Sequence, residues 1–116
     1  PTNLNFKNVS DSKNVLYTAT TNIYILKISV CNILENKEGI TVTFQRVRNI
    51  AAADSESRTI TKAIIKIPQY NTCNLLKEIN EDMLFLPKDD SIIIYTNGYQ
   101  RRCDIDMDIL TITELA

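Results

Sequence analysis

Three aspartates near the C-terminal end are the residues whose types and spacing come closest to a chemical site. Asp104, Asp106 and Asp108 are two residues apart, and a β-strand places such residues on one face of its sheet. Clustered carboxylates suit calcium, but this segment lacks the central glycine of an EF-hand loop, and Leu115 stands where the closing glutamate would be. We therefore expect no metal site and no cofactor.

These three residues, called here the acidic stripe, have three other interpretations. The stripe is a solvated outer face, or its charges deter edge-to-edge pairing of strands, with Arg101 and Arg102 as cross-strand partners. In the third, the stripe meets a basic patch on a neighbouring subunit and sets its register. On this last interpretation Asp104, Asp106 and Asp108 are candidate interface residues.

The residues that most enzymes use are missing or poorly placed. Histidine is absent, which removes the commonest general base and metal ligand, and the two glycines, Gly39 and Gly98, cannot form a phosphate-binding loop. Asp89 and Asp90 are paired carboxylates of the type used in glycoside hydrolysis, but they lie in a predicted turn. We expect no catalytic residue and a protein that is not an enzyme.

Composition and charge limit the possible partners. The 116 residues are 44% hydrophobic and 23% charged, which is typical of a globular domain. Lys and Arg number 13 against 14 Asp and Glu, so there is no excess of positive charge for nucleic acid. No apolar run is long enough to span a membrane, and no signal peptide is visible. We expect neither nucleic acid nor membrane as a partner, and synthesis in the cytoplasm.

The three cysteines are predicted to be structural. Cys31, Cys73 and Cys103 are odd in number and far apart, and none belongs to a C-x-x-C pair. A disulfide framework or a zinc site is therefore not expected. Free cysteines in apolar segments behave as small hydrophobic residues.

Short segments rich in Ile, Val, Thr and Tyr, separated by turns, predict an all-β domain. Their spacing and the absence of long helical patterns favour an antiparallel β-sandwich or jelly roll of about eight strands. The expected strands are Val15–Thr18, Ile23–Leu34, Ile40–Arg48, Arg58–Ile67, Cys73–Leu76, Met83–Leu86, Ser91–Thr96 and Gln100–Thr113.

The segment over residues 23–30 indicates irregular geometry. Ile23 and Ile25 are at odd positions, whereas Leu26, Ile28 and Val30 are at even positions, so the apolar face switches partway along the strand. This switch predicts a bulge or a sheet-switching bend near Leu26.

Two further segments carry turn and helix signals. Asn97-Gly98 lies between two apolar segments and readily supplies the positive φ angles of a type I′ turn. Leu75–Met83 has apolar residues at helical spacing, so a helix there is an alternative to the strand.

The first fourteen residues differ from the rest. Residues 1–14 are polar apart from Leu4, Phe6 and Val9, so we expect an extended N-terminal arm, followed by one sandwich domain over residues 15–116. The apolar residues of such an arm would add to a neighbouring sheet or lie in a groove. Leu4, Phe6 and Val9 are therefore candidate interface residues as well.

The order of the strand sequences resembles a known class of proteins. Residues 15–18 read VLYT, residues 25–32 read ILKISVCN, residues 40–44 read ITVTF, and residues 84–92 read LFLPKDDSI. This series is similar to the strands of small structural proteins of tailed bacteriophage particles. The chain departs from their pattern at residues 19–21, where Ala-Thr-Thr replaces a Pro-Ala-Gly turn, and at Asp89, where glycine is usual.

The resemblance implies a β-sandwich component of the virion, a capsid decoration or a head, neck or tail protein. Its partners would be other copies of itself and other virion proteins, in a symmetric homo-oligomer. The alternative is a receptor- or carbohydrate-binding module of a phage fibre or spike, whose sign would be exposed aromatic residues at the loop ends.

Overall fold

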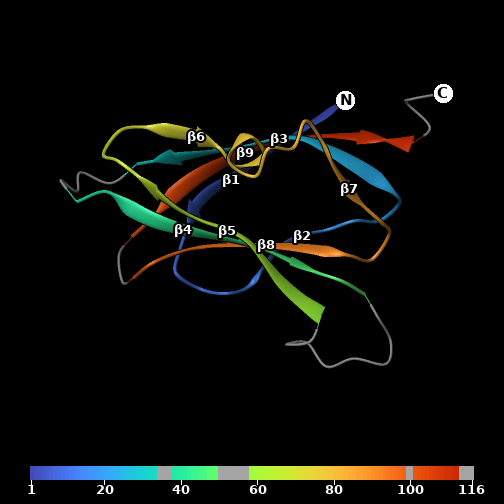
Figure 1. Cartoon of the computed structure of the whole chain (residues 1–116), viewed down its shortest axis with the longest axis horizontal. Coiled ribbons are helices and arrows are strands. Elements are labelled where there is room, and N and C mark those ends of the chain that lie inside the picture. The colour runs from blue at the N-terminus through green and yellow to red at the C-terminus, as the bar shows by residue number, and fades with distance from the viewer. Residues whose placement is uncertain (34–37, 50–57, 99–100, 113–116) are drawn as a thin grey trace.

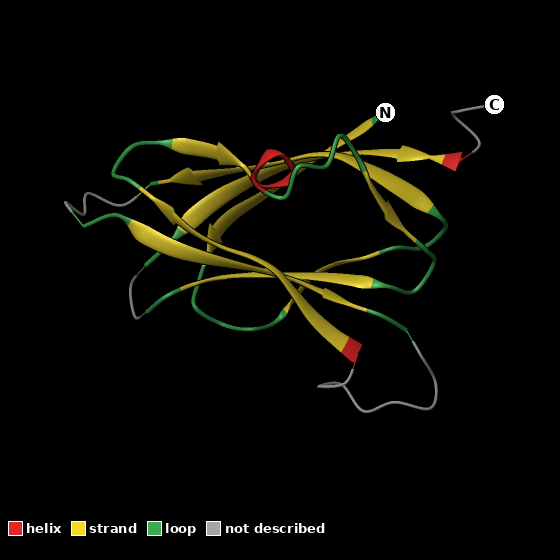
Figure 2. Cartoon of the chain, in the orientation of Figure 1, coloured by secondary structure: helices red, strands yellow, loops and turns green. Residues whose placement is uncertain are grey.

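The computed structural model describes residues 1–33, 38–49, 58–98 and 101–112, and forms two antiparallel sheets packed face to face (Figures 1 and 2). In chain order the elements are β1 (Thr2–Val9), β2 (Val15–Thr18), β3 (Ile23–Asn32), β4 (Ile40–Val47), β5 (Thr59–Ile67), β6 (Thr72–Asn74), α2 (Leu75–Glu78), β7 (Leu84–Leu86), β8 (Ser91–Thr96) and β9 (Cys103–Thr111). The predicted all-β sandwich is confirmed, with nine strands among the described residues.

The two sheets contain strands that are distant in the sequence. The first sheet has the order β1-β9-β3-β6, with β7 also paired to β3, and the second has the order β2-β8-β4-β5. In Figure 1 these sheets form the upper and lower layers, and β8 and β9 lie in different layers. Consecutive strands therefore often change sheet.

The core lies between the layers and follows from alternation along each strand. Ile40, Val42 and Phe44 of β4 are at most 1% exposed, while the threonines between them face outward. β3 and β9 contribute in the same way from the other sheet, and Leu75 and Leu76 of α2 are buried at one end. Isoleucine is the commonest residue of this core, and its branched side chain suits tightly packed strands.

The predicted irregularity in β3 is a bulge. The register of β3 against β9 shifts between Ile25 and Lys27, so Leu26 is the extra residue. Ile25 and Ile28 are fully buried on either side of it, and Lys27 faces outward. The bulge keeps both apolar sets of β3 in the core.

The expectation of a separate N-terminal arm is wrong for residues 2–9. β1 pairs antiparallel with β9 of its own sheet, and its apolar residues Leu4, Phe6 and Val9 are half-buried against the core. They occupy the same face as Cys103, Ile105 and Met107 of β9, their cross-strand partners. The alternation of Leu4 and Phe6 was therefore the pattern of an edge strand.

The predicted type I′ turn at Asn97-Gly98 is also wrong. Neither residue has a positive φ angle, and the strands on either side, β8 and β9, belong to different sheets. The connection crosses the sandwich, so the local geometry of a hairpin is not required. Residues 99–100, in the same connection, lie outside the described part of the chain.

The segment predicted as a strand over Cys73–Leu76 is divided between two elements. β6 ends at Asn74, and α2 forms one turn from Leu75 to Glu78. The Asn74 side-chain oxygen accepts a hydrogen bond from the Leu76 backbone N–H at 3.2 Å, which caps the turn. The helical alternative is correct for this turn only.

Candidate functional site

The acidic stripe lies in the middle of a sheet. β9 has β1 on one side and β3 on the other, and Asp104, Asp106 and Asp108 point to the outer face. The interpretation that they protect an edge is therefore wrong, because β9 is not an edge strand.

Residues of the two neighbouring strands pair with the stripe. Lys27 of β3 places its Nζ 2.9 Å from Asp106 Oδ2 and 3.5 Å from Asp108 Oδ2. From β1, Lys7 lies 3.4 Å from Asp104. The partners of the stripe are thus lysines of the same sheet, and the expected pairing with Arg101 and Arg102 is not observed in the described residues.

Two residues of β1 add hydrogen bonds from the other side. The Asn3 amide donates to Asp106 and, at 2.7 Å, to Asp108, and the Asn8 backbone N–H donates to Asp104 at 3.0 Å. The Asn3 hydrogen bond first, and the Lys27 ammonium second, lower the pKa of Asp106. The hydrogen bond to Asp106 likewise raises the pKa of Lys27.

The three carboxylates of the stripe therefore have two lysine partners within the chain, Lys7 and Lys27, which leave one negative charge uncompensated. A basic neighbour would have to compete with Lys27 for Asp106. Among the residues described, no cluster of three or more His, Cys, Asp or Glu side chains is placed to hold a metal ion.

The other half of the same outer face is apolar. Phe85 of β7, Tyr24 of β3 and Leu110 of β9 lie side by side across three neighbouring strands, because Tyr24 is the cross-strand partner of both others. The Tyr24 and Phe85 rings are 5.3 Å apart between centroids at a tilt of 47°. We call these three residues the apolar row.

The apolar row is open to solvent. Phe85 is 40% exposed, and Met83 and Ile112, which flank the same strands, are 42% and 41% exposed. An apolar surface on adjacent strands of a sheet is suited to contact with another protein.

A second exposed apolar area lies on the outer face of the other sheet. Ile64 of β5 is 67% exposed and is aligned, through Thr43 of β4, with Tyr95 of β8. The Lys13 ammonium lies 5.2 Å from the centre of the Tyr95 ring. Apolar side chains thus lie beside the outward-facing Thr43 of β4 on this face.

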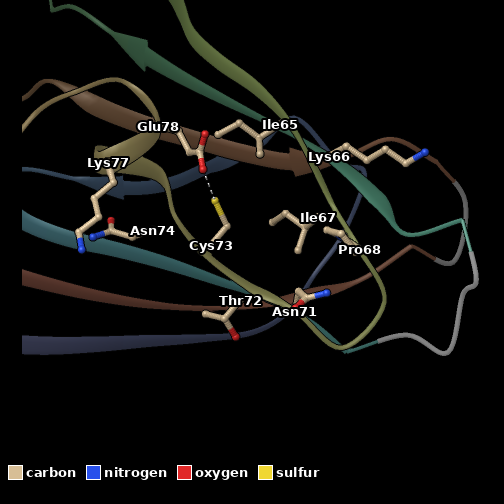
Figure 3. A pocket seen from close by; sticks show the side chains of 10 residues that line it. All are labelled: Ile65, Lys66, Ile67, Pro68, Asn71, Thr72, Cys73, Asn74, Lys77 and Glu78. Carbon is tan, nitrogen blue, oxygen red and sulfur yellow. Dashed lines mark hydrogen bonds between the residues drawn. The ribbon is translucent and has the colours of Figure 1, made fainter.

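A cavity of about 500 Å³ lies between the edges of the two sheets (Figure 3). In Figure 3 the Cys73 thiol and the Glu78 carboxylate point toward one another, and Cys73 Sγ donates to Glu78 Oε1 at 3.4 Å. Burial first, and Glu78 second, raise the pKa of Cys73 to about 11, so the thiol stays protonated. The cavity is lined by Ile65, Lys66, Ile67, Pro68, Asn71, Thr72, Cys73, Asn74, Lys77 and Glu78.

The structure does not place the six predicted interface residues on one available surface. Leu4, Phe6 and Val9 face the core. The carboxylates of the acidic stripe form ion pairs and hydrogen bonds with residues of the neighbouring strands β1 and β3. Sequence reasoning missed the apolar row, although one signal was present. Leu84, Phe85 and Leu86 form a three-residue apolar strand, so alternation must turn one of them outward.

Comparison with protein-family models finds no match, and comparison with curated protein sequences finds none either. Within the described residues, no helix has the length and apolar character needed to cross a membrane.

Proposed function

We propose that the protein is a non-enzymatic structural protein that acts through protein–protein contacts in a symmetric assembly. The observation that carries this proposal is the apolar row, which exposes Phe85 on a rigid, multi-stranded sheet. An aromatic residue fixed by a neighbouring ring loses little conformational freedom when a partner covers it. Interfaces of lasting assemblies are enriched in such residues.

A repeated assembly suits a small domain that carries such a surface. Each copy presents the same row, and contacts between identical copies close into rings or extend into lattices. Most of the charge on the other half of the same face is compensated by Lys7 and Lys27, so this half can border an interface with little unpaired charge.

We place this assembly in the particle of a tailed bacteriophage, as a capsid decoration or a head, neck or tail component. The support is the resemblance noted above, whose four segments correspond to β2, β3, β4 and the β7–β8 connection. Asp89 stands where those proteins usually have glycine, and it has a φ angle of 73°, in the region that favours glycine.

A second candidate function is receptor or carbohydrate binding. One observation favours it: Tyr70, at the turn between β5 and β6, is 62% exposed and adjoins Asn71 of the cavity. Sugar-binding sites combine exposed aromatic rings with amide side chains, but here a single ring is present beside the cavity.

The test is the mass of the purified chain in solution by light scattering, alone and with purified phage heads and tails. We expect a defined oligomer or saturable attachment to particles. Phe85→Ser should abolish the oligomer or the attachment. Val15→Ser, which replaces a 52% exposed residue of the other sheet, is the control and should leave both unchanged. Circular dichroism confirms that both variants fold.

Other outcomes decide against the proposal. The proposal is contradicted if the chain is a monomer that does not attach to phage particles, or if the Phe85→Ser variant still forms the oligomer. Binding to a glycan array that Tyr70→Ala abolishes would instead support the carbohydrate-binding function.

A further inference from the structure

β5 is an edge strand with one open side. It is the last strand of the second sheet and pairs with β4 from Thr59 to Ile67, with a bulge at Lys62. No described strand pairs with its other side. Backbone groups on the open side of an edge strand can pair with a further strand.

The side chains of β5 alternate between two surroundings near its C-terminal end. Ile65 and Ile67 face inward, where Ile67 is 1% exposed and Ile65 packs against the core. Ile64 and Lys66 face outward, opposite Thr43 and Thr41 of β4. A strand added beside β5 would meet the same alternation.

The cavity described above adjoins this edge. Ile65, Ile67 and Pro68 form its β5 wall, and residues of β6 and α2 form the opposite wall (Figure 3). A strand added to β5 would direct its inward-facing side chains into the gap between the sheet edges. A volume of about 500 Å³ is ample for one apolar side chain.

The surroundings of this edge are positively charged. Lys62 and Lys66 of β5 and Lys77 of α2 form no ion pair with another described residue. The one carboxylate of the cavity, Glu78, accepts a hydrogen bond from Cys73. In Figure 3 the Lys66 side chain extends away from the cavity, toward the outer face.

We propose that the β5 edge and its cavity bind an extended segment of another protein by strand addition. An acidic residue of the segment lies opposite Lys66, its neighbour enters the cavity as an apolar anchor, and the next residue, also apolar, lies opposite Ile64. Backbone hydrogen bonds supply affinity, and the cavity and Lys66 supply specificity.

The occupant is a different protein and not the β5 of a second copy. Antiparallel pairing of two β5 strands about Ile64 would bring Lys62 of each copy opposite Lys66 of the other, and like charges on adjoining strands repel. The inference does not depend on the apolar row, which lies on the other sheet.

Fluorescence anisotropy of labelled nine-residue peptides with the full chain tests the proposal. A peptide with Glu-Ile-Val at its centre should bind at least 10-fold more tightly than one with Lys-Ile-Val or Glu-Ser-Ser. Lys66→Glu should reverse the preference between the first two peptides. Lys88→Glu, an exposed lysine in the turn before β8, is the matched control and should change nothing.

Amide hydrogen exchange identifies the binding element independently. Saturating Glu-Ile-Val peptide should slow exchange at β5 amides and leave those of β2, the opposite edge of the same sheet, unchanged. The proposal is overturned if the three peptides bind equally weakly, if Lys66→Glu has no effect on binding, or if protection appears elsewhere.

Two outcomes separate this inference from the proposed function. If the Lys66→Glu variant forms an oligomer of a different mass from that of the wild type, β5 contacts a second copy, and the inference is wrong. If Phe85→Ser abolishes assembly but keeps peptide binding, both conclusions stand independently.

Discussion

The Arg46 guanidinium donates a hydrogen bond to the Asp90 carboxylate at 2.9 Å and so joins β4 to the residue that precedes β8. The two side chains are 19% and 9% exposed. The other Asp90 oxygen accepts from the Asn49 backbone N–H at 2.9 Å, while Arg46 Nε has no hydrogen-bond partner in the described structure. The Asp90 carboxylate therefore joins β4, the residues that follow it and the start of β8 at this end of the second sheet.

Removing one partner of this pair should be costly. Asp90→Ala leaves the Arg46 charge largely buried and unpaired, so the free energy of unfolding should fall by about 3 kcal/mol. Asp90→Asn keeps an oxygen for the Asn49 N–H and should cost less. Urea denaturation gives both values, and equal stability of Asp90→Ala and the wild type would show that the pair contributes nothing.

Gly39 should not tolerate a side chain. Its φ angle is 75°, and an added Cβ would lie 2.6 Å from the Ile67 carbonyl oxygen. Gly39→Ala should lower the free energy of unfolding by about 2–3 kcal/mol. Gly98→Ala is the matched control, because its Cβ would meet nothing closer than 3.9 Å. Similar denaturation midpoints for the two variants would contradict this account.

The fold was largely predictable because alternation is a local property. The bulge at Leu26 could be placed from the change of parity between Ile25 and Ile28 alone. The Asn97-Gly98 turn could not, because whether β8 and β9 pair depends on the sheet to which each belongs. Sheet membership is decided by contacts between distant segments, which short-range patterns do not encode.

The same distinction applies to the candidate site. The two-residue repeat of a β-strand correctly predicted that Asp104, Asp106 and Asp108 lie on one face. Their partners Lys27 and Asn3, however, come from β3 and β1. Without the strand order, those partners could not be identified.

The acidic stripe should respond to loss of its partners in a defined order. Asn3→Ala and Lys27→Met should each raise the pKa of Asp106, because the Asn3 hydrogen bond is the largest single cause of the lowered value and Lys27 adds both a hydrogen bond and a charge. Lys7→Met is the control and should have the least effect. NMR titration of the Asp106 carboxyl measures each pKa, and a larger shift in Lys7→Met than in the other two variants would contradict the geometry.

The lowered pKa of Asp106 also predicts how the stability of the folded chain changes with pH. A folded-state pKa below the ordinary value of 3.8 contributes stability above that value, and the contribution disappears as the pH falls through the folded pKa. Acid unfolding of Asn3→Ala should therefore begin at a higher pH than that of the wild type. Coincident acid transitions would contradict the linkage.

The thiols of Cys73 and Cys103, whose pKa values are raised, should resist alkylation. Burial is the main cause that raises the pKa of Cys103 to about 12, while burial and Glu78 raise that of Cys73 to about 11. At pH 8 iodoacetamide should modify the half-buried Cys31 first, as mass spectrometry can show. Faster labelling of Cys103 than of Cys31 would contradict its burial.

These thiols also link stability to alkaline pH. Their folded-state pKa values exceed the ordinary value of 9.0, so the unfolded chain loses its thiol protons at lower pH. The contribution of these two thiols to stability should therefore be constant below about pH 9 and fall as the pH rises from there toward 12. Cys103→Ala should show a weaker decline than the wild type in urea denaturation across this range.

The first strand should be part of the folding unit. Leu4, Phe6 and Val9 are half-buried against the core, and β1 covers an edge of β9 that would otherwise be open. Deleting residues 1–9 should therefore lower the free energy of unfolding by about 3 kcal/mol or more, and Phe6→Ala alone should lower it by about 2 kcal/mol. Asn5→Ala, on the exposed face of the same strand, is the control and should be nearly neutral. If the deletion unfolds at the same urea concentration as the wild type, β1 is a detachable segment, and an arm that pairs with neighbouring subunits becomes the better description.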